Sequence, residues 1–283
     1  MTPVKSSNIN YALISKSSSQ PLGGGVLRRT TAVPERRCRL GILGGMGPLA
    51  SAEFLKTVYR LNLAEPEQRM PICVLVSDPS FPDRSEAILA GVTEELAESL
   101  SRALEELAAL GAERLLVACI TIHHLLPGLR EPLRRKIISL IDLIADDVLA
   151  SPRPRLLLAT HGTRATRLFE RHPRWDLLSP WIRWPDAEDQ RAVHDWIYRL
   201  KIGEPPAGCC TWLDGLGLKY GVDGFVFACT ELHLCQQEIA ARPAGRDGFD
   251  VVDPLLTAAR RLQDPDWFYA GSELPELAEA PGA

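Results

Sequence analysis

The sequence predicts an α/β fold with two similar lobes, each a mainly parallel sheet flanked by helices, and a functional site in the cleft between them. Two observations support this prediction. From Cys38 onward, short apolar runs alternate with segments of helical periodicity, which is the pattern of a parallel sheet covered on both faces. In addition, one segment of the first half recurs in the second half, which indicates two related α/β units.

Five apolar runs have the length of buried strands. These runs are Arg39–Leu43, Ile72–Val76, Arg114–Ala118, Arg155–Ala159 and Phe225–Ala228. The helical patterns include Ala50–Leu61, Glu94–Leu110, Glu188–Leu200 and Pro254–Leu262. Pro48 suits the first turn of the first helix, and Gly111 suits the end of the second. The alternation of strands and helices therefore extends over most of the chain.

The recurring segment ends in a cysteine in both halves. Its first copy reads Gly111-Ala-Glu-Arg-Leu-Leu-Val-Ala-Cys119, and its second reads Gly221-Val-Asp-Gly-Phe-Val-Phe-Ala-Cys229. In each copy an acidic residue follows the glycine by two positions, and Ala-Cys ends the apolar run. A histidine follows each cysteine by four positions, His123 in the first half and His233 in the second.

A weaker repeat relates Arg39-Leu-Gly-Ile-Leu to Arg155-Leu-Leu-Leu-Ala, and it predicts the domain organisation. The boundary between the lobes is expected near Ser151-Pro-Arg-Pro154. We expect a first lobe at 38–148, a second lobe at 149–248, and a returning helix within 249–270 that packs on the first lobe. Residues 1–37 are rich in Ser, Thr, Pro and Gly and are expected to form a disordered leader, and residues 271–283 a loose tail.

Composition excludes several classes of protein. The net charge of −4 provides no basic footprint for nucleic acid, and no run approaches the roughly 18 apolar residues of a membrane span. The seven cysteines are odd in number and scattered, which is not a disulfide framework. No secretory signal is visible, so we expect a cytoplasmic protein with free thiols and, by default, a homodimer.

Cys119 and Cys229, the cysteines of the repeated segment, are candidate catalytic residues because ligands of open parallel sheets bind outside the carboxyl ends of the strands. Two facing thiols suit proton transfer at a carbon acid, with one thiolate removing a proton and the other thiol delivering one to the opposite face. The alternatives are buried structural cysteines and a zinc site formed with His123 and His233. The zinc hypothesis has weak support, because the compact Cys-x₂₋₄-Cys knuckle is absent.

A glycine-rich loop, Gly45-Met-Gly-Pro-Leu-Ala50, follows the first strand and opens the first helix. It matches the loose form of a dinucleotide-binding loop. The acidic candidate for the ribose is Asp78, which lies 31 residues beyond Gly47 instead of the expected roughly 20. We therefore favour a tight turn whose exposed amides bind a small carboxylate.

Several separated motifs together resemble the cofactor-independent aspartate/glutamate racemase superfamily, and its aspartate-racemase-like branch most of all. Leu40–Ala50 resembles the opening strand and substrate-carboxylate loop, and Ser77–Arg84 is similar to the S-N-P-x-x-P-D-R segment. Cys119–His123 matches C-N-T-A-H in part. The remaining matches are Ala159–Thr163 to A-T-x-x-T, Leu200–Gly203 to L-K-x-G, and Ala228–Glu231 to G-C-T-E. The resemblance runs from about Leu40 to Leu262.

The resemblance implies a two-lobed racemase that uses no cofactor and no metal, with Cys119 and Cys229 as the proton-transfer residues. It implies that Arg84 and Lys201 hold the side-chain carboxylate of a dicarboxylic amino acid, most closely aspartate. Hydroxyls and strand-end amides would bind the α-carboxylate. The substrate-binding set that we expect is Met46, Gly47, Asp78, Arg84, Thr121, Thr160, Thr163, Lys201, Thr230 and Glu231, with His123 and His233 as candidate relays.

The sequence differs from the family pattern beside the first cysteine. Ile120 and Ile122 replace Asn and Ala, and Asp78 replaces Asn in the second segment. An apolar neighbour at position 120 is expected to raise the pKa of Cys119. Two further functions therefore stay open on the same fold: a related diacid isomerase or decarboxylase, and a non-catalytic ligand-binding protein.

Overall fold

The structure is a computed structural model, and it describes residues 38–64, 67–242 and 248–270. The predicted leader at 1–37 and the tail at 271–283 lie outside the described residues. The described residues belong to one compact unit. The boundaries that we expect between two lobes therefore stay a prediction.

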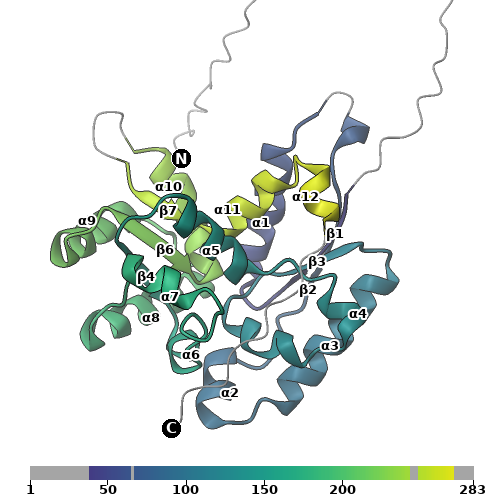
Figure 1. Cartoon of the computed structure of the whole chain (residues 1–283), viewed down its shortest axis with the longest axis horizontal. Helices are drawn as coiled ribbons and strands as arrows, with labels where there is room; N and C mark the ends of the chain where they lie inside the picture. The colour runs from purple at the N-terminus through teal and green to yellow at the C-terminus, as the bar shows by residue number, and fades with distance from the viewer. Residues whose placement is uncertain (1–37, 65–66, 243–247, 271–283) are drawn as a thin grey trace, which may run out of the picture. The chain divides into compact units, whose positions relative to one another are not determined.

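Two separate parallel sheets form the framework (Figure 1). The first has the order β2 (Ile72–Ser77), β1 (Arg39–Gly44), β3 (Arg114–Val117). The second has the order β5 (Ile182–Arg183), β4 (Arg155–Ala159), β6 (Gly224–Ala228), β7 (Asp250–Val252). The predicted fold class, two α/β units with parallel sheets flanked by helices, is confirmed.

The helices connect these strands. The α-helices are α1 (Pro48–Leu61), α2 (Arg84–Ala90), α3 (Glu94–Ala109), α4 (Glu131–Arg134), α5 (Leu140–Ala150), α6 (His161–Ala165), α7 (Trp175–Leu178), α8 (Ala187–Lys201), α9 (Cys209–Tyr220), α10 (Gln236–Ala240), α11 (Pro254–Arg261) and α12 (Pro265–Tyr269). The short 3₁₀ helices are η1 (Glu67–Arg69), η2 (Thr121–Gly128), η3 (Ser179–Trp181) and η4 (Thr230–Cys235).

The two sheets share one strand order, which accounts for the repeats in the sequence. β1 and β4 are the strands of the weaker repeat, and β3 and β6 are those of the stronger one. In each sheet the two lie side by side. On the far side of β3, Leu115 forms a single parallel bridge to Ile137, at the place that β7 takes beside β6. The first sheet is thus a reduced copy of the second.

Alternation along the strands divides the core into three clusters. Leu115 and Val117 of β3 face one cluster with α3, and Phe225 and Phe227 of β6 face another with α8 and α9. The intervening residues face a third cluster that draws on both sheets and on α1, α5 and α11. Because successive side chains of a strand point to opposite faces, Cys119 and Cys229 continue the outward rows of β3 and β6.

The last described helices return to the first half of the chain. α11 contacts α1 and α5, and the Asn62 side-chain amide donates to the Ala259 carbonyl over 2.8 Å. By contrast β7, which lies in the same 249–270 segment, pairs with β6 of the second sheet.

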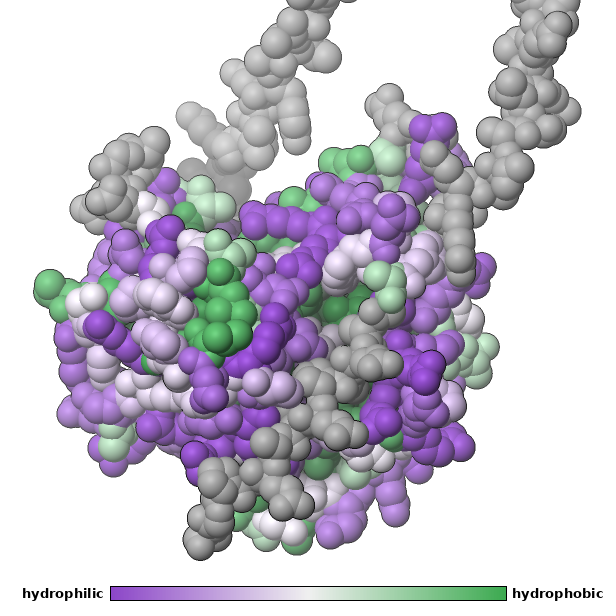
Figure 2. All heavy atoms as spheres, in the orientation of Figure 1, coloured by the Kyte–Doolittle hydropathy of each residue, from purple (hydrophilic) through white to green (hydrophobic). Residues whose placement is uncertain are grey.

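The face of the molecule drawn in Figure 2 is covered mostly by hydrophilic side chains, with smaller hydrophobic areas between them. Among residues 38–64, 67–242 and 248–270, no helix is both long and apolar enough to cross a membrane.

Candidate active site

Cys119 and Cys229 each follow the end of a buried strand, and both are almost inaccessible, with exposed fractions of 6% and 5%. Each is followed by a 3₁₀ helix, η2 after Cys119 and η4 after Cys229. The two thiols are near enough that charge on Cys119 contributes to raising the pKa of Cys229. The geometry thus brings together the two cysteines that the sequence repeat singles out.

The surroundings of the two thiols differ. Burial raises the pKa of Cys119, and the Glu231 carboxylate adds to the effect, whereas the Arg84 guanidinium, the Ile122 N–H and Lys201 oppose it. Burial raises the pKa of Cys229 well above its usual value, and there the Glu231 charge is the next cause of the rise. The Cys229 thiol donates to Glu231 Oε2 over 2.8 Å. This hydrogen bond holds a proton on Cys229.

Glu231 and Arg84 both have unused hydrogen-bonding capacity inside the site. Glu231 is 2% exposed, and its Oε1 atom is buried without a hydrogen-bond partner. Arg84 is 7% exposed, and its Nε–H is likewise buried and unpartnered. Buried polar groups are nearly always satisfied in native proteins, so these two atoms are able to bind the polar groups of a ligand. The site offers it one charged acceptor and one charged donor.

Backbone carbonyls hold the Arg84 guanidinium in place. Nη2 donates to the Met46 carbonyl over 2.9 Å, and Nη1 donates to the Pro82 carbonyl over 2.9 Å and to the Phe81 carbonyl over 3.4 Å. Burial opposes its charge, but the pKa of Arg84 is raised by Cys119, Asp83 and other anionic groups. Met46 contributes its carbonyl here, while its own side chain is buried in the cluster of α3.

Threonine hydroxyls connect the two halves of the chain. Thr121 Oγ1 on η2 lies 3.0 Å from Thr160 Oγ1 and 2.9 Å from Thr163 Oγ1, both of which belong to the start of α6. Thr230 Oγ1 donates to the Ala118 carbonyl over 3.1 Å, so η4 is tied to the end of β3. All four predicted threonines are buried.

Lys201, at the end of α8, lies near Glu231 and Cys229. Its Nζ atom is 3.4 Å from Asp83 Oδ2 and 4.0 Å from the centroid of the Tyr198 ring. Burial would lower the pKa of Lys201, but Glu231 and Cys229 outweigh that effect and raise it.

The histidines that follow the cysteines have both ring nitrogens engaged. His123 Nδ1 lies 2.8 Å from the Cys119 carbonyl, and its Nε2 accepts from the Leu140 N–H over 3.2 Å. Burial lowers the pKa of His123 to about 4, so this ring is neutral at pH 7. His233 lies between Asp253 and Thr57, at 2.6 Å and 3.0 Å. These contacts occupy the ring nitrogens that a zinc ion would need.

The family model of Asp/Glu/hydantoin racemases matches residues 43–262. The chain belongs to this family. The protein is thus an amino-acid racemase by family, which confirms the resemblance inferred from the motifs.

Solved structures of racemases have the same fold. Aspartate racemase from Picrophilus torridus is 24% identical, with a TM-score of 0.64, over 80% of this chain and 94% of that one. An aspartate racemase homologue from Pyrococcus horikoshii is 20% identical, with a TM-score of 0.57, over 80% and 97%. Glutamate racemase from Francisella tularensis, solved with D-glutamate, is 11% identical, with a TM-score of 0.55, over 82% and 81%.

Ile120 of the racemase, at the position of a family asparagine, is buried in the cluster shared by both sheets. Cys119 belongs to the cluster of α3, so the side chains of Cys119 and Ile120 lie on opposite faces of the chain segment that continues β3. The pKa of Cys119 is raised first by burial of its own thiol, and the Ile120 side chain, from which we expected the rise, packs in a different cluster. The apolar side chain at position 120 therefore completes the core.

Asp78 differs from the other predicted binding residues. Its Oδ1 atom accepts from the Ser80 N–H over 2.8 Å and from the Ser80 hydroxyl over 2.6 Å. The residue also lines a separate pocket of about 260 Å³ beside Glu95 and Arg102 of α3. Its backbone packs against Gly45, where a Cβ atom would lie 2.2 Å from the Asp78 carbonyl oxygen.

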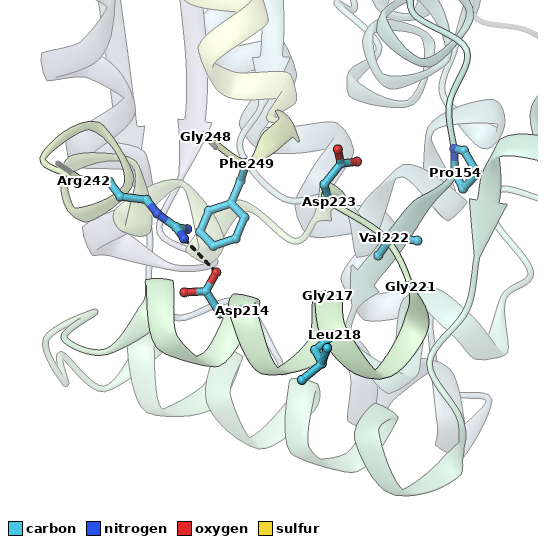
Figure 3. A pocket seen from close by; sticks show the side chains of 10 residues that line it. All are labelled: Pro154, Asp214, Gly217, Leu218, Gly221, Val222, Asp223, Arg242, Gly248 and Phe249. Carbon is cyan, nitrogen blue, oxygen red and sulfur yellow. Dashed lines mark hydrogen bonds and ion pairs between the residues drawn. The ribbon is translucent and has the colours of Figure 1, made fainter. Parts of the chain in front are cut away.

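A larger pocket of about 840 Å³ lies at the amino ends of the second sheet's strands, whereas Cys229 follows a carboxyl end (Figure 3). Pro154, Asp223 and Phe249, which line it, each precede a strand. Arg242 points across it and pairs with Asp214 over 2.8 Å. None of the predicted site residues lines this pocket.

Asp83 and Tyr198 are near-site residues that the sequence reasoning missed. Asp83 contacts Lys201, and the Tyr198 hydroxyl donates to Asp83 Oδ1 over 2.7 Å. The available signals were the position of Asp83 directly before Arg84, with Glu86 at the third position after it, and the helical i, i+3 spacing of Tyr198 and Lys201.

Changing Gly47 to alanine is expected to lower kcat/KM about tenfold while the fold persists. A Cβ atom at position 47 would lie 2.2 Å from Glu231 Oε1, so the carboxylate must move away from Cys229. The loss of about 1.4 kcal/mol corresponds to part of a charge-assisted hydrogen bond. Racemisation rate and melting temperature are the measurements.

Gly128→Ala is the matched control, because no atom lies within 4 Å of the added Cβ there. The double variant Gly47→Ala/Glu231→Gln tests whether Gly47→Ala lowers kcat/KM by displacing Glu231. If the two losses add fully, the effect of Gly47→Ala does not pass through Glu231.

Proposed function

We propose that this racemase interconverts the enantiomers of an acidic amino acid, aspartate first, by proton transfer between Cys119 and Cys229 without a cofactor. The observation that carries the proposal is the unused pair beside the thiols, the Arg84 Nε–H and the Glu231 Oε1 atom. An amino acid is a zwitterion, and a dicarboxylic one adds a second carboxylate. Its ammonium group complements Glu231, and its distal carboxylate complements Arg84.

The α-carboxylate is assigned to the three mutually contacting hydroxyls of Thr121, Thr160 and Thr163. Each of these hydroxyls has acceptor and donor capacity that a carboxylate can exchange for its present partners. Lys201 adds positive charge on the side of the distal carboxylate. The preference for aspartate follows from the motif resemblance and from the likeness to the Picrophilus torridus aspartate racemase.

The different surroundings of the thiols define a starting state for the reaction. Arg84 opposes the rise in the pKa of Cys119, whereas the contact with Glu231 keeps the Cys229 proton on sulfur. In our proposal Cys119 is the thiolate and Cys229 the thiol when the first enantiomer binds. Burial of both sulfurs keeps bulk water away from the carbanion.

The proton balance is then complete. The Cys119 thiolate takes the α-proton, so the Cα–H bond breaks, an S–H bond forms and the electron pair stays on the substrate as an enolate-like carbanion. The Cys229 S–H bond breaks and its proton forms a new Cα–H bond on the opposite face. The product leaves Cys119 as the thiol and Cys229 as the thiolate, which is the state that accepts the other enantiomer.

The proposal extends to a homodimer in a reducing, cytoplasmic compartment. The reducing compartment is supported by the cysteines of the described residues, none of which is joined to another in a disulfide.

The test is racemisation in heavy water, started from each pure enantiomer of aspartate and of glutamate, with alanine and serine as controls. Proton NMR follows the α-proton, and chiral chromatography separates the enantiomers. A thiol carries a single proton, so a two-base enzyme returns the original proton to unreacted substrate. We therefore expect early solvent deuterium in the product enantiomer alone.

Two results would contradict this proposal. Equal deuterium in substrate and product at early times would indicate one base instead of two. Exchange or turnover confined to neutral amino acids would contradict the acidic substrate.

A further inference from the structure

Asp83 caps the helix that begins with Arg84. Its Oδ1 atom accepts from the N–H groups of Ser85 and Glu86 over 2.9 Å and 3.0 Å, at the first turn of α2. Such a cap fixes where the helix starts. The position of the Arg84 backbone, one residue further on, therefore depends on the Asp83 carboxylate.

The same carboxylate reaches α8 of the second half of the chain. The Tyr198 hydroxyl donates to Oδ1 over 2.7 Å, and Lys201 Nζ lies 3.4 Å from Oδ2. The Asp83 side chain is 22% exposed and that of Lys201 17% exposed. Oδ1 receives the capping and tyrosine donors, which leaves Oδ2 for the lysine. One side chain thus connects the two cations of the site.

Both members of this ion pair are charged at pH 7. Burial would raise the pKa of Asp83, but Lys201, the Glu86 N–H, the Tyr198 hydroxyl and Arg84 outweigh it and lower the pKa. The pKa of Lys201 is raised. Within the described part of the chain, Asp83 is the carboxylate that pairs with Lys201. An ammonium group has three donors, so the pair leaves Lys201 with donors for a second carboxylate.

We propose that Asp83 is a positioning residue that sets the preference for dicarboxylic substrates by holding Lys201 in line with Arg84. The inference rests on the proposed function, in which these two cations bind the distal carboxylate. Lysine has a long, flexible side chain, and ordering it at the moment of binding weakens affinity. Asp83 and the Tyr198 ring order it beforehand, so the substrate meets a fixed ammonium group.

This role predicts an effect on KM more than on kcat, because the distal carboxylate is bound alike in the ground state and the transition state. Asp83→Asn keeps an oxygen acceptor for the cap and for Tyr198 but removes the charge that holds Lys201. We expect the KM for acidic amino acids to rise about five- to tenfold with kcat within about twofold of wild type. A residue that acts only on folding would not raise KM while leaving kcat nearly unchanged.

A double-variant comparison tests whether Asp83 acts through Lys201. In the Lys201→Ala background, Asp83→Asn is expected to add no further rise in KM, because its partner is gone. Asp264→Asn is the matched control, since Asp264 caps α12 through the same pattern of two backbone N–H groups. That variant is expected to leave KM and kcat unchanged.

Calorimetric binding of succinate separates this inference from the proposed function, because succinate has two carboxylates but no racemisable centre. We expect Asp83→Asn to weaken succinate binding about five- to tenfold, but not in the Lys201→Ala background. Asp83→Ser, which retains a capping oxygen, gives the same measurement should Asp83→Asn not fold.

Unchanged succinate affinity in the folded Asp83 variants, additive losses in the double variant, or no succinate binding by the wild type would each overturn the inference. Should the wild type bind succinate with the expected dependence on Asp83 and Lys201 yet racemise neither aspartate nor glutamate, the positioning role stands and the proposed function fails.

Discussion

Changing Cys119 or Cys229 to alanine is expected to abolish racemisation starting from either enantiomer. Each turnover needs one thiolate and one thiol, so removal of either sulfur stops both directions. General acid or base catalysis by a positioned group contributes roughly 10²- to 10⁴-fold, and we expect losses of at least that size. Chiral chromatography of product formed from each enantiomer is the measurement.

Serine variants give a sharper test because the two thiols lie in different surroundings. Cys229→Ser keeps the Cys119 sulfur beside Arg84, where the cation favours the thiolate. We expect this variant to exchange the α-proton of one enantiomer slowly, without inversion. Cys119→Ser keeps only the sulfur that is bonded to Glu231, so its exchange should be slower and confined to the other enantiomer.

Cys210→Ala is the control, because this partly buried cysteine of α9 lies outside the group around Glu231. Its variant should racemise like the wild type. Full racemisation by Cys119→Ala or Cys229→Ala would rule out the two-thiol mechanism. The same melting temperature in active and inactive variants would exclude unfolding as the cause of a loss.

The longer buried strands are the part of the fold that a sequence predicts best. Buried parallel strands are continuous apolar runs, and Arg155–Ala159 agrees with β4 at both ends. β5 and β7 were missed because they have two and three residues, too few for a periodic signal. α9 was missed as well, since Gly215 and Gly217 interrupt its apolar pattern.

The part of the site that the sequence predicts is the part that lies at strand ends. Each cysteine follows the carboxyl end of the equivalent strand in its own sheet, so the repeat predicts that both lie at the ligand-binding ends of the two sheets. The contact of Asp83 with Lys201 joins residues 118 positions apart on two helices. Such a contact depends on how α2, which packs on α6 and η2, is placed relative to α8, and no local pattern encodes it. The orphaned atoms of Arg84 and Glu231 are likewise visible only in three dimensions.

Replacing Arg84 or Lys201 with alanine is expected to reduce kcat/KM for acidic amino acids far more than for alanine or serine. Each cation is assigned a charge-assisted contact with the distal carboxylate, which is worth about 1.5–3 kcal/mol. That energy corresponds to a loss of about 10- to 150-fold for aspartate and glutamate. A neutral side chain makes no such contact, so its already slow reaction should change little.

The two residues need different controls because they are held differently. Arg84→Ala also leaves the carbonyls of Met46 and Pro82 without their donor, so part of its effect can be a loss of stability. Arg84→Lys keeps a positive charge without the guanidinium fork, and an intermediate loss is expected from it. Lys201→Ala leaves Asp83 Oδ2 without its donor, and Lys219→Ala, which breaks the ion pairs of Lys219 with Asp186 and Asp189, is its control.

The decisive quantity is the ratio of kcat/KM for aspartate to kcat/KM for alanine in each variant, measured by α-proton exchange in heavy water. A fall in this ratio for both Lys201→Ala and Arg84→Lys, with melting temperatures near that of the wild type, would assign the distal carboxylate to this pair of cations. If both variants keep the preference for acidic substrates, the assignment fails, and the charge that selects the substrate must lie elsewhere. Glu231 cannot take that role, because a buried carboxylate repels the distal group that has to be bound.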